Sequence, residues 1–412
     1  MDRRRGLLLV LGLAVLVAVG GALAVTLVPS GPTLIATWVS DPPDGAGGNH
    51  HGPAVGTVDG QPLVFAPISG VSQGPACRLA ALDAATGEAV WRHQVPPEDC
   101  TVHAVADPTV AVRNGRLSVI VATTQNAVFD LAPASGAVRD RFDLDSYGYT
   151  PPQMVDLSPD PGQELLIADA RGTVQLIDAN GSVRWRESYG AFIWAQPIVA
   201  DFSGGGERQV AIGTSDGRLL VLDRTGGTVR EVVDPFNGSV TWMAAGQLDE
   251  DPALEIVAAT ASGQVIAVDG ATGRVQWTRT FGQFAAVATI GDGNNDGTNE
   301  VYVTAADGAV RALAAGTGRT EWERTVATRD VQMMPPPVLG DVTGDATADL
   351  VVVSNDGRVV ALNPGSGAVL AEYTRDEMVF EKATLADVDD DPGLETFVMY
   401  ADGAVVRLDY KA

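Results

Sequence analysis

Lysine is almost absent from this chain. Only Lys382 and Lys411 are lysines among the 27 basic residues of a 412-residue sequence, whereas Asp and Glu number 52, and the formal net charge is −25. Binding to nucleic-acid phosphates requires clustered Lys and Arg side chains. The composition therefore excludes nucleic acid as a partner held by a basic surface.

The excess acid is spread along the chain and forms no acidic tail. A dispersed acidic surface with so little lysine is typical of a halophilic protein, because screening over roughly 3 Å at 1 M salt removes the self-repulsion. The alternative explanation is a biased base composition of the gene combined with acids that bind calcium.

Long apolar runs are absent except at the N-terminus. Residues 6–28 carry no charge and follow Arg3, Arg4 and Arg5. As a helix this run would reach ~35 Å, enough for a hydrocarbon core of ~30 Å, and the arginines would stay in the cytoplasm. We predict one transmembrane helix in residues 1–28 that anchors residues 29–412 at the extracellular side of the cell membrane. The alternative is secretion after cleavage of a signal peptide near residues 22–24.

Cysteine and histidine are scarce. The two cysteines, Cys77 and Cys100, flank one predicted hairpin, and an exported protein occupies a compartment that permits disulfides. We expect them to be bonded, with two free thiols as the alternative. The pair His50–His51 has no spaced carboxylate or cysteine partner, and no nucleophile or phosphate-loop motif occurs. The sequence therefore predicts no catalytic residues.

Internal repetition is the strongest signal. Segments 262–277, 307–322 and 356–370 each read as an alternating apolar strand, a glycine-containing turn and a second strand, which is typical of β-hairpins. Each hairpin follows an apolar strand, an acidic turn and an apolar run. One unit thus holds four short strands in ~45–50 residues, the size of a propeller blade.

The acidic positions give the number of blades. They fall near Asp59, Asp107, Asp156, Asp201, Asp249, Asp292, Asp341 and Asp387. We predict an all-β fold, an eight-bladed propeller of four-stranded blades, with a strand near 33–39 completing the last blade and closing the ring. Closure leaves no exposed sheet edge within the ring. Seven blades are the alternative, if two units merge.

The repeats resemble the PQQ-like (quinoprotein-type) propeller family. Its docking pattern, Ala-x-Asp-x-x-x-Gly-x-x-x-Trp, occurs as ALDAATGEAVW at 81–91 and as AVDGATGRVQW at 267–277. The resemblance implies a propeller whose Asp, Gly and Trp residues dock blades. It also implies, as an alternative function, a PQQ-dependent or related oxidoreductase. The vicinal cysteine pair of many such enzymes is missing, and no site for the cofactor is recognisable, so we expect no PQQ.

The acidic turns resemble the calcium turns of FG-GAP repeats, in which acids at alternate positions of a tight loop point inward. The resemblance implies that Ca²⁺ stabilises the propeller through up to four turns. The implied ligands are Asp292, Asn294, Asp296, Thr298 and Glu300; Asp387, Asp389, Asp391 and Glu395; Asp341, Asp345 and Asp349; and Asp156, Asp160 and Glu164. The turn at Asp249, Asp251 and Glu255 departs from the pattern because Gln247 stands in its first place. The alternative is that these turns are merely solvated.

Residues just before each inner strand are expected to line one mouth of the ring. These are His51, Tyr149, Trp194, Trp242, Phe284, Met334 and Phe380, with Glu381 and Lys382 beside the last. Aromatic and Met side chains on an otherwise acidic surface suit a ligand or partner surface. The alternative is that they cover the core between blades.

Together these features predict a membrane-anchored extracytoplasmic propeller that serves as a protein- or ligand-binding scaffold. A protein or a glycan is the expected partner, and enzymatic activity is not expected.

Overall fold

The structure is a computed structural model that describes residues 31–160, 162–232, 236–389 and 391–412. The transmembrane helix predicted in residues 1–28 lies outside these ranges. Within them, no helix has the length and apolar character needed to cross a membrane.

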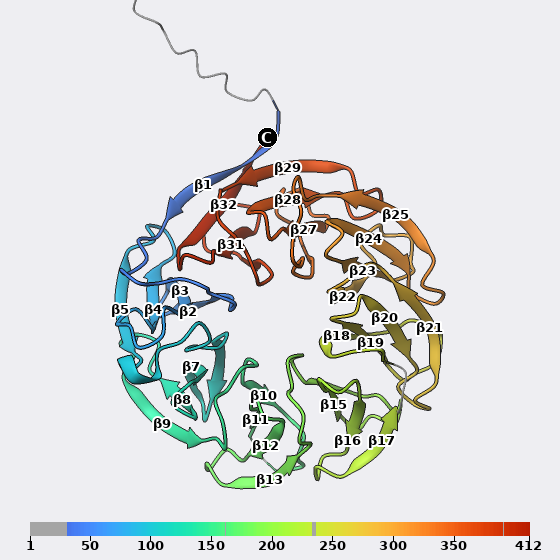
Figure 1. Ribbon diagram of the computed structural model, residues 1–412, viewed down its shortest axis with the longest axis horizontal. Helices are drawn as coiled ribbons and strands as arrows, with labels where there is room; N and C mark the ends of the chain where they lie inside the picture. Colours follow the sequence, from blue (N-terminus) through green and yellow to red (C-terminus); the bar gives the residue numbers. More distant parts are fainter. Residues whose placement is uncertain (1–30, 161, 233–235, 390) are drawn as a thin grey trace, which may run out of the picture. The chain divides into compact units, whose positions relative to one another are not determined.

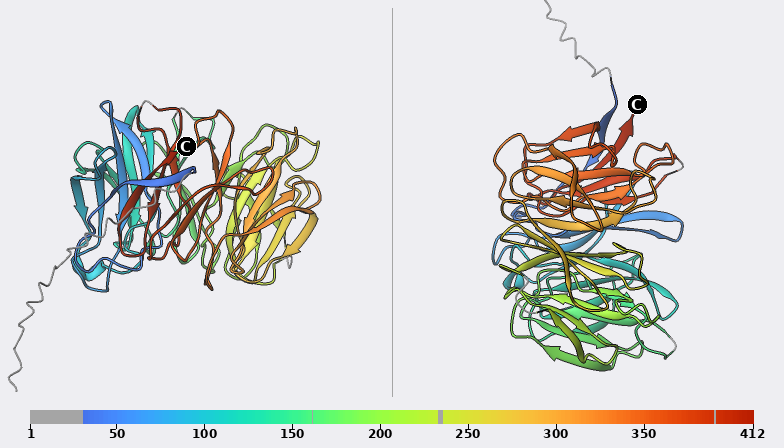
Figure 2. Two further views of the ribbon diagram at one scale, coloured as in Figure 1. Left: turned by 90° about the horizontal axis from the view of Figure 1, so that it is seen from above. Right: turned by 90° about the vertical axis from the view of Figure 1, so that its right-hand side faces the viewer.

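Residues 32–412 form eight four-stranded antiparallel sheets that stand around a ring (Figure 1). This confirms the predicted all-β propeller of eight four-stranded blades and excludes the seven-bladed alternative. Seen edge-on, the strands cross the thickness of the ring and the loops lie on its two faces (Figure 2).

Blades I to VIII are named here in chain order, with strands given from the innermost to the outermost. Blades I to IV are β2 (Ala54–Val58), β3 (Gln61–Ile68), β4 (Arg78–Asp83), β5 (Ala89–Gln94); β6 (Thr109–Arg113), β7 (Arg116–Thr123), β8 (Ala127–Leu131), β9 (Val138–Asp143); β10 (Gln153–Val155), β11 (Glu164–Ala168), β12 (Thr173–Ile177), β13 (Val183–Ser188); β14 (Ile198–Ala200), β15 (Gln209–Gly213), β16 (Leu219–Leu222), β17 (Thr228–Val232).

Blades V to VIII are β18 (Val240–Gly246), β19 (Glu255–Thr260), β20 (Gln264–Val268), β21 (Val275–Thr280); β22 (Ala286–Gly291), β23 (Glu300–Thr304), β24 (Ala309–Ala314), β25 (Thr320–Thr325); β26 (Val338–Gly340), β27 (Asp349–Val353), β28 (Arg358–Leu362), β29 (Val369–Thr374); β30 (Thr384–Ala386), β31 (Glu395–Met399), β32 (Val405–Lys411), β1 (Thr33–Val39). A short 3-10 helix, η1 (Pro97–Asp99), precedes blade II.

The core lies between neighbouring blades. The second strands of blades III, VI and VII (β11, β23 and β27) are buried at every position, and they read as apolar runs because both faces of each sheet pack against another blade. In the outer strands, by contrast, buried and exposed side chains alternate. In β5 only Trp91 is buried, so this strand covers the blade with one face and meets solvent with the other.

The two ends of the described chain share one sheet. Strand β1 pairs antiparallel with β32 from Thr33 opposite Lys411 to Val39 opposite Val406, and β32 continues through β31 to β30. Blade VIII therefore takes its outer strand from the beginning of the ring and its other strands from the end. The ring is closed by backbone hydrogen bonds.

Tryptophans on the outer strands connect consecutive blades. The indole N–H of Trp91 donates to the carbonyl oxygen of Pro133 at 2.7 Å, and that of Trp277 donates to Ala315 at 2.6 Å. Trp38, Trp185 and Trp322 make the same bond to Ala84, Arg224 and Pro364. Each acceptor lies in the turn between the third and outer strands of the next blade.

A glycine lies against each of these indoles. Gly136 has a φ of +68°, and a Cβ built on it would lie 2.4 Å from the Trp91 ring. The equivalent contacts are Gly87 with Trp38, Gly226 with Trp185, Gly318 with Trp277 and Gly367 with Trp322. Glycine is required here both by the left-handed backbone and by the ring that covers it.

The connection into blade II departs from the expected spacing. Asp107 is not in a turn between an inner and a second strand; that turn in blade II is Asn114–Gly115, with φ of 51° and 72°. The connection from β5 to β6 is longer than those that enter blades III to VIII, and it contains η1 and Cys100, which is bonded to Cys77. The regular step between acidic positions therefore placed Asp107 wrongly.

The antiparallel order separates two kinds of connection. Turns between inner and second strands, which include the acidic turns, lie on one face together with the turns between third and outer strands. Connections from one blade to the next lie on the opposite face, at the mouth of the ring.

The tryptophan–glycine contact predicts a specific loss of stability. Gly136→Ala should lower the free energy of unfolding by about 1–2 kcal/mol for the left-handed backbone, and by a further 1–3 kcal/mol for overpacking against Trp91. Gly115→Ala is the matched control in the same blade, because its φ is +72° and no atom lies within 4 Å of the added Cβ. Guanidinium unfolding compares them, and equal losses would contradict an inter-blade role for Gly136.

Candidate functional site

Blade-to-blade connections converge on a cavity of about 410 Å³ at the mouth of the ring. Of the residues that the sequence placed there, His51, Tyr149, Trp194, Trp242, Phe284, Phe380, Glu381 and Lys382 all line it. Met334 does not. Its side chain is fully buried in the core between blades VI and VII, and Met333 lines the cavity in its place. We call this space the mouth cavity.

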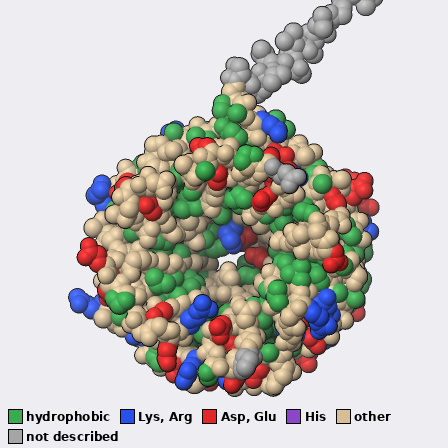
Figure 3. Space-filling model, turned by 180° about the vertical axis from the view of Figure 1, so that it is seen from behind, with side chains coloured by type: hydrophobic (Ala, Val, Ile, Leu, Met, Phe, Trp, Pro, Cys, Tyr) green, Lys and Arg blue, Asp and Glu red, His purple; other side chains and the backbone are tan. Residues whose placement is uncertain are grey.

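The centre of the ring is visibly hollow (Figure 3). In this view from behind Figure 1, hydrophobic side chains surround the opening, and charged side chains of both signs are visible within it.

Proline carbonyls fix the start of three inner strands, β10, β26 and β2. Thr109 donates its hydroxyl to the carbonyl of Pro152, Thr289 to Pro337 and Thr384 to Pro53, at 2.5, 2.9 and 2.6 Å. Each bond ties an inner strand to the residue just before the next inner strand. Proline also restricts the backbone that precedes it, so the residues just upstream are held in place around the mouth.

Aromatic side chains contact one another along the wall. Phe192 stacks on Trp194 with ring centroids 5.0 Å apart and an interplanar angle of 9°, and Tyr149 contacts Trp194 edge-on at 4.9 Å. The Tyr149 ring also contacts His51 and His103. His50 stacks on Phe380 at 4.4 Å. The wall is therefore continuous from blade IV through blade I to blade VIII.

A histidine–carboxylate pair lies in the cavity. His51 Nδ1 is 3.0 Å from Asp107 Oδ1, and the same oxygen accepts the backbone N–H of Gly52 at 2.7 Å. Burial raises the pKa of Asp107, but the hydrogen bond and charge of His51, the charge of Lys382 and the Gly52 N–H lower it by more, so its net pKa is below the usual value. Asp107 is thus a buried carboxylate that its neighbours hold ionised.

A second charged pair comes from the connection into blade VIII. Lys382 Nζ donates to Glu381 Oε1 at 2.9 Å and lies 5.6 Å from the centre of the Trp242 ring. Burial lowers the pKa of Lys382, but Glu381 and Asp107 raise it by more, so the ammonium remains charged. Burial also raises the pKa of Glu381 above its usual value, against the opposing charge of Lys382.

Three of the four histidines of the chain lie at this mouth, namely His50, His51 and His103. Burial lowers the pKa of His50, and burial together with the charges of His51 and His50 lowers that of His103 to about 4. His103 was not predicted from the sequence, and Asp107 was predicted to lie in an acidic turn of blade II instead of at the mouth. Both lie in the long connection into blade II, where the spacing of acidic positions gave the wrong alignment.

The chemistry available to this site is limited by its partners. His51 Nε2 has no hydrogen-bond partner among the described residues. The site offers a fixed imidazole acceptor, a lysine, two carboxylates and aromatic faces, which together are suited to recognition of a ligand.

The acidic turns on the opposite face differ in whether their carboxylates converge. Asp292, Asp296 and Glu300 lie with carboxylate oxygens within 4.8 Å of one another. Asn294 donates to Asp296 and Glu300 from the same turn, while the amide and hydroxyl of Thr298 both donate to Asp296. These residues lie in the turn between β22 and β23 and at the first position of β23.

In the turn of blade VIII an arginine lies among the carboxylates. Asp389, Asp391 and Glu395 converge, whereas the side chain of Asp387 is exposed outside this group. Arg407 of β32 binds Asp389 at 2.5 Å and lies 3.6 Å from Glu395. The arginine already supplies positive charge at this turn.

Two other predicted turns do not gather their acids. Asp341 accepts the amides of Gly344, Asp345 and Ala346, while Asp349 accepts those of Val342 and Thr343. In blade III, Asp160 is paired with Arg184, Glu164 binds Ser158 and the amide of Leu157, and Asp156 forms no acidic group with them.

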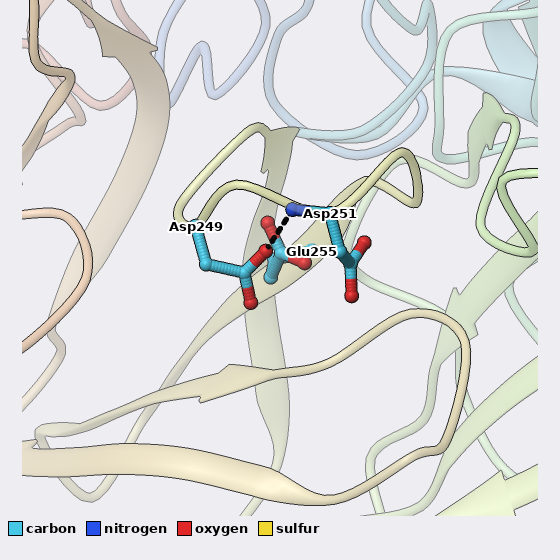
Figure 4. Close-up of side chains that lie close together, drawn as sticks. All are labelled: Asp249, Asp251 and Glu255. Carbon is cyan, nitrogen blue, oxygen red and sulfur yellow. Dashed lines mark hydrogen bonds between the residues drawn. The ribbon is translucent and has the colours of Figure 1, made fainter.

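The turn that the sequence ranked lower does bring its acids together. Asp249, Asp251 and Glu255 lie within 4.8 Å of one another, and the amide of Asp251 donates to Asp249 at 2.9 Å (Figure 4). Glu255 is fully buried. Its Oε2 accepts the amide of Leu248, but its Oε1 has no partner among the described residues, and burial raises its pKa to about 7. A carboxylate so placed fits a bound cation.

The profile of the family described as outer membrane protein assembly factor BamB, a family of PQQ-like repeats, matches residues 75–292 and 227–403. None of the curated protein sequences matches this chain.

Solved structures share the fold across nearly the whole chain. BamB from Moraxella catarrhalis is 19% identical, with 92% of this chain and 98% of that chain covered and a TM-score of 0.60. The C-terminal WD40 domain of Sif2 is 13% identical, with 92% and 99% covered and a TM-score of 0.63. The computationally designed Ika8 protein is 15% identical, with 89% and 98% covered and a TM-score of 0.59. Identities this low show the fold alone.

Glu255 predicts a dependence of stability on pH when divalent cations are removed. Its pKa in the folded protein is raised to about 7, so the folded state favours the protonated carboxyl, and stability is lost as the pH rises toward and through 7. The lost stability is roughly 3 kcal/mol at most, at ~1.4 kcal/mol per pKa unit.

Urea unfolding in EDTA between pH 5 and 8 measures this effect as the difference between the wild type and Glu255→Gln. Glu164→Gln is the matched control, because both carboxylate oxygens of Glu164 are already hydrogen-bonded. A pH profile that Glu255→Gln leaves unchanged would contradict the assignment.

Proposed function

The chain belongs to the BamB family of PQQ-like repeat propellers, and from this premise we propose that it is a protein-binding scaffold. The partner binds at the mouth of the ring, on an aromatic rim made of Phe192, Trp194 and Phe284. The family model that matches the chain is described as an outer membrane protein assembly factor.

Exposed aromatic side chains carry this proposal. Phe192 is 42% exposed and Phe284 is 43% exposed, although both are large and apolar. Phe192 already stacks on Trp194, so its contact surface is ordered before any partner arrives. Aromatic anchors of this kind supply most of the binding energy in many interfaces, and preorganisation reduces the entropic cost of association.

The backbone of Phe284 supports the same assignment. Its φ is 46°, in the left-handed region that a bulky side chain seldom adopts. Its amide donates to the carbonyl of Ala261 at 2.9 Å, which holds the turn in this conformation. A strained residue with an exposed apolar side chain indicates selection for the side chain rather than for the turn.

We propose further that Ca²⁺ stabilises the propeller at two turns on the opposite face. The carboxylates of Asp292, Asp296 and Glu300 form one site, and those of Asp249, Asp251 and Glu255 form the other. Oxygen ligands on short loops are what Ca²⁺ prefers. The unpartnered Glu255 Oε1 favours the second site, although its first position is glutamine.

Attachment to a membrane remains part of the proposal. It rests on residues 1–28, whose charge-free run and preceding arginines favour a single-pass anchor with the propeller on the extracellular side. The net charge of −25 with two lysines supports a protein that works in high salt.

Substitutions in the aromatic rim should abolish binding of the protein partner. A tagged full-length chain, purified from native membranes in high salt, should recover a stoichiometric protein partner by mass spectrometry. Phe192→Ser combined with Phe284→Asn should reduce recovery at least ten-fold, and asparagine suits the left-handed backbone, so the fold is preserved. Val183→Ser with Val275→Ser is the control, because both valines are similarly exposed on outer strands. Recovery of the chain alone, or equal recovery by both variants, would overturn the proposal.

Binding of Ca²⁺ at these turns should raise the melting temperature of the protein. The wild type at pH 7.5 should melt at a higher temperature in CaCl₂ than in EDTA, since a ligand at 100 times its Kd adds about 2.7 kcal/mol to stability. Asp292→Asn with Glu300→Gln, and separately Asp249→Asn with Glu255→Gln, should each remove part of the shift. Asp345→Asn is the control from a turn without converging acids. Identical melting in both buffers would rule out both sites.

A further inference from the structure

The mouth cavity contains polar atoms that nothing in the structure satisfies. His51 Nε2 and Ser239 Oγ both belong to residues that line the cavity, and neither has a hydrogen-bond partner among the described residues. The His51 side chain is only 4% exposed. A buried polar atom left without a partner costs about 1–3 kcal/mol, so these atoms indicate a missing ligand group.

Asp107 determines what His51 offers to such a ligand. An ionised carboxylate accepts hydrogen bonds only, so the 3.0 Å contact places a proton on His51 Nδ1. In the neutral ring Nε2 then carries a lone pair. The group that meets it must be a hydrogen-bond donor, and Ser239 can either donate or accept.

The charges of the cavity pair with one another. Lys382 is bonded to Glu381, and Asp107 is bonded to His51. With the His51 ring neutral, these four residues leave one negative charge, on Asp107, whose Oδ1 is hydrogen-bonded to His51 Nδ1 and to the amide of Gly52. An anionic ligand would face two carboxylates, and a cationic ligand would face Lys382. The arrangement favours a neutral ligand that both donates and accepts hydrogen bonds.

The remaining surface of the cavity is largely aromatic. Tyr149, Trp194, Trp242, Phe284 and Phe380 line it, and a volume of about 410 Å³ lies in the lower part of the range of ~300–1,000 Å³ typical of small-ligand sites. A ligand therefore needs apolar faces as well as donors. Pyranose sugars combine both, because their C–H faces pack on aromatic rings while their hydroxyl groups donate and accept.

We propose that the mouth cavity binds a neutral saccharide of one or two pyranose rings, with a sugar hydroxyl donating to His51 Nε2 and a second hydroxyl bonded to Ser239. Asp107 is a positioning residue that fixes the imidazole tautomer. The site goes beyond the protein-binding role, uses residues inside the cavity rather than the exposed Phe192, and stands whether or not a protein partner is found.

Titration of tryptophan fluorescence in the full chain tests this with maltose, cellobiose and N,N′-diacetylchitobiose. At least one of them should bind saturably. Ser239→Ala and His51→Gln should each weaken that binding about ten-fold, a loss equivalent to one hydrogen bond, and Trp242→Ala should weaken it more. The natural ligand could be part of a glycan chain or a free sugar, and the hexamer of the same sugar distinguishes these. Tighter binding of the hexamer than of the disaccharide indicates a glycan chain, and equal binding indicates a free sugar.

His93→Gln is the matched control, because His93 is the one histidine that does not line the cavity and lies on outer strand β5. It should bind as the wild type does. If His51→Gln fails to fold, as judged by its melting temperature, Ser239→Ala decides the question, since it removes only a hydroxyl. Failure of all three disaccharides to bind, or binding that folded Ser239→Ala and Trp242→Ala variants retain in full, would overturn the proposal. Partner capture by Ser239→Ala should be unchanged, so the result is independent of the protein-binding test.

Discussion

The hydrogen bond from an outer-strand indole to a turn carbonyl of the next blade is the contact on which this ring depends. It recurs at five of the eight blade junctions, each time with a glycine under the indole. At the junction of blades IV and V, Arg230 donates to Gly270 instead and lies over Gly273. This repeated contact holds neighbouring blades against each other in a similar way, and the ring closes where β1 pairs with β32. The mouth cavity inherits its shape from this arrangement, since its residues come from nearly every blade.

Much of the fold follows from the repeat, because the docking pattern and the glycine turns are local. The mouth residues could be predicted for the same reason: Tyr149 and Trp194 each lie four residues before the first residue of an inner strand, β10 and β14. Local alignment failed where a unit changes length. Because the connection into blade II is long, the repeat did not place Asp107 and His103 at the mouth. The prediction was also wrong by one residue at Met334, since Met333 lines the cavity. The pairing of His51 with Asp107 joins neighbouring blades, and no spacing within one repeat reports it.

The acidic turns show a different limit of prediction from sequence. A turn motif indicates which oxygens one loop can offer, but the cation that neutralises them can come from another strand. Arg407 of β32 lies among the carboxylates of the blade VIII turn, and Arg184 of β13 pairs with Asp160 in blade III. The turn at Glu255, whose sequence fits the pattern less well, has converging acids and a buried oxygen without a partner. Occupancy of such turns depends on the neighbouring strands as much as on the loop.

Closure of blade VIII by β1 has a consequence for the order of events in synthesis. The strand that leaves the ribosome first among the described strands pairs with the one that leaves last. Until Val405–Lys411 has emerged, Thr33–Val39 has no partner, and seven blades form an open arc with an unpaired end. The loop that must close spans almost the whole propeller, so this step is entropically the most demanding. A growing chain of this architecture benefits from delayed release or from a chaperone that shields the waiting strand.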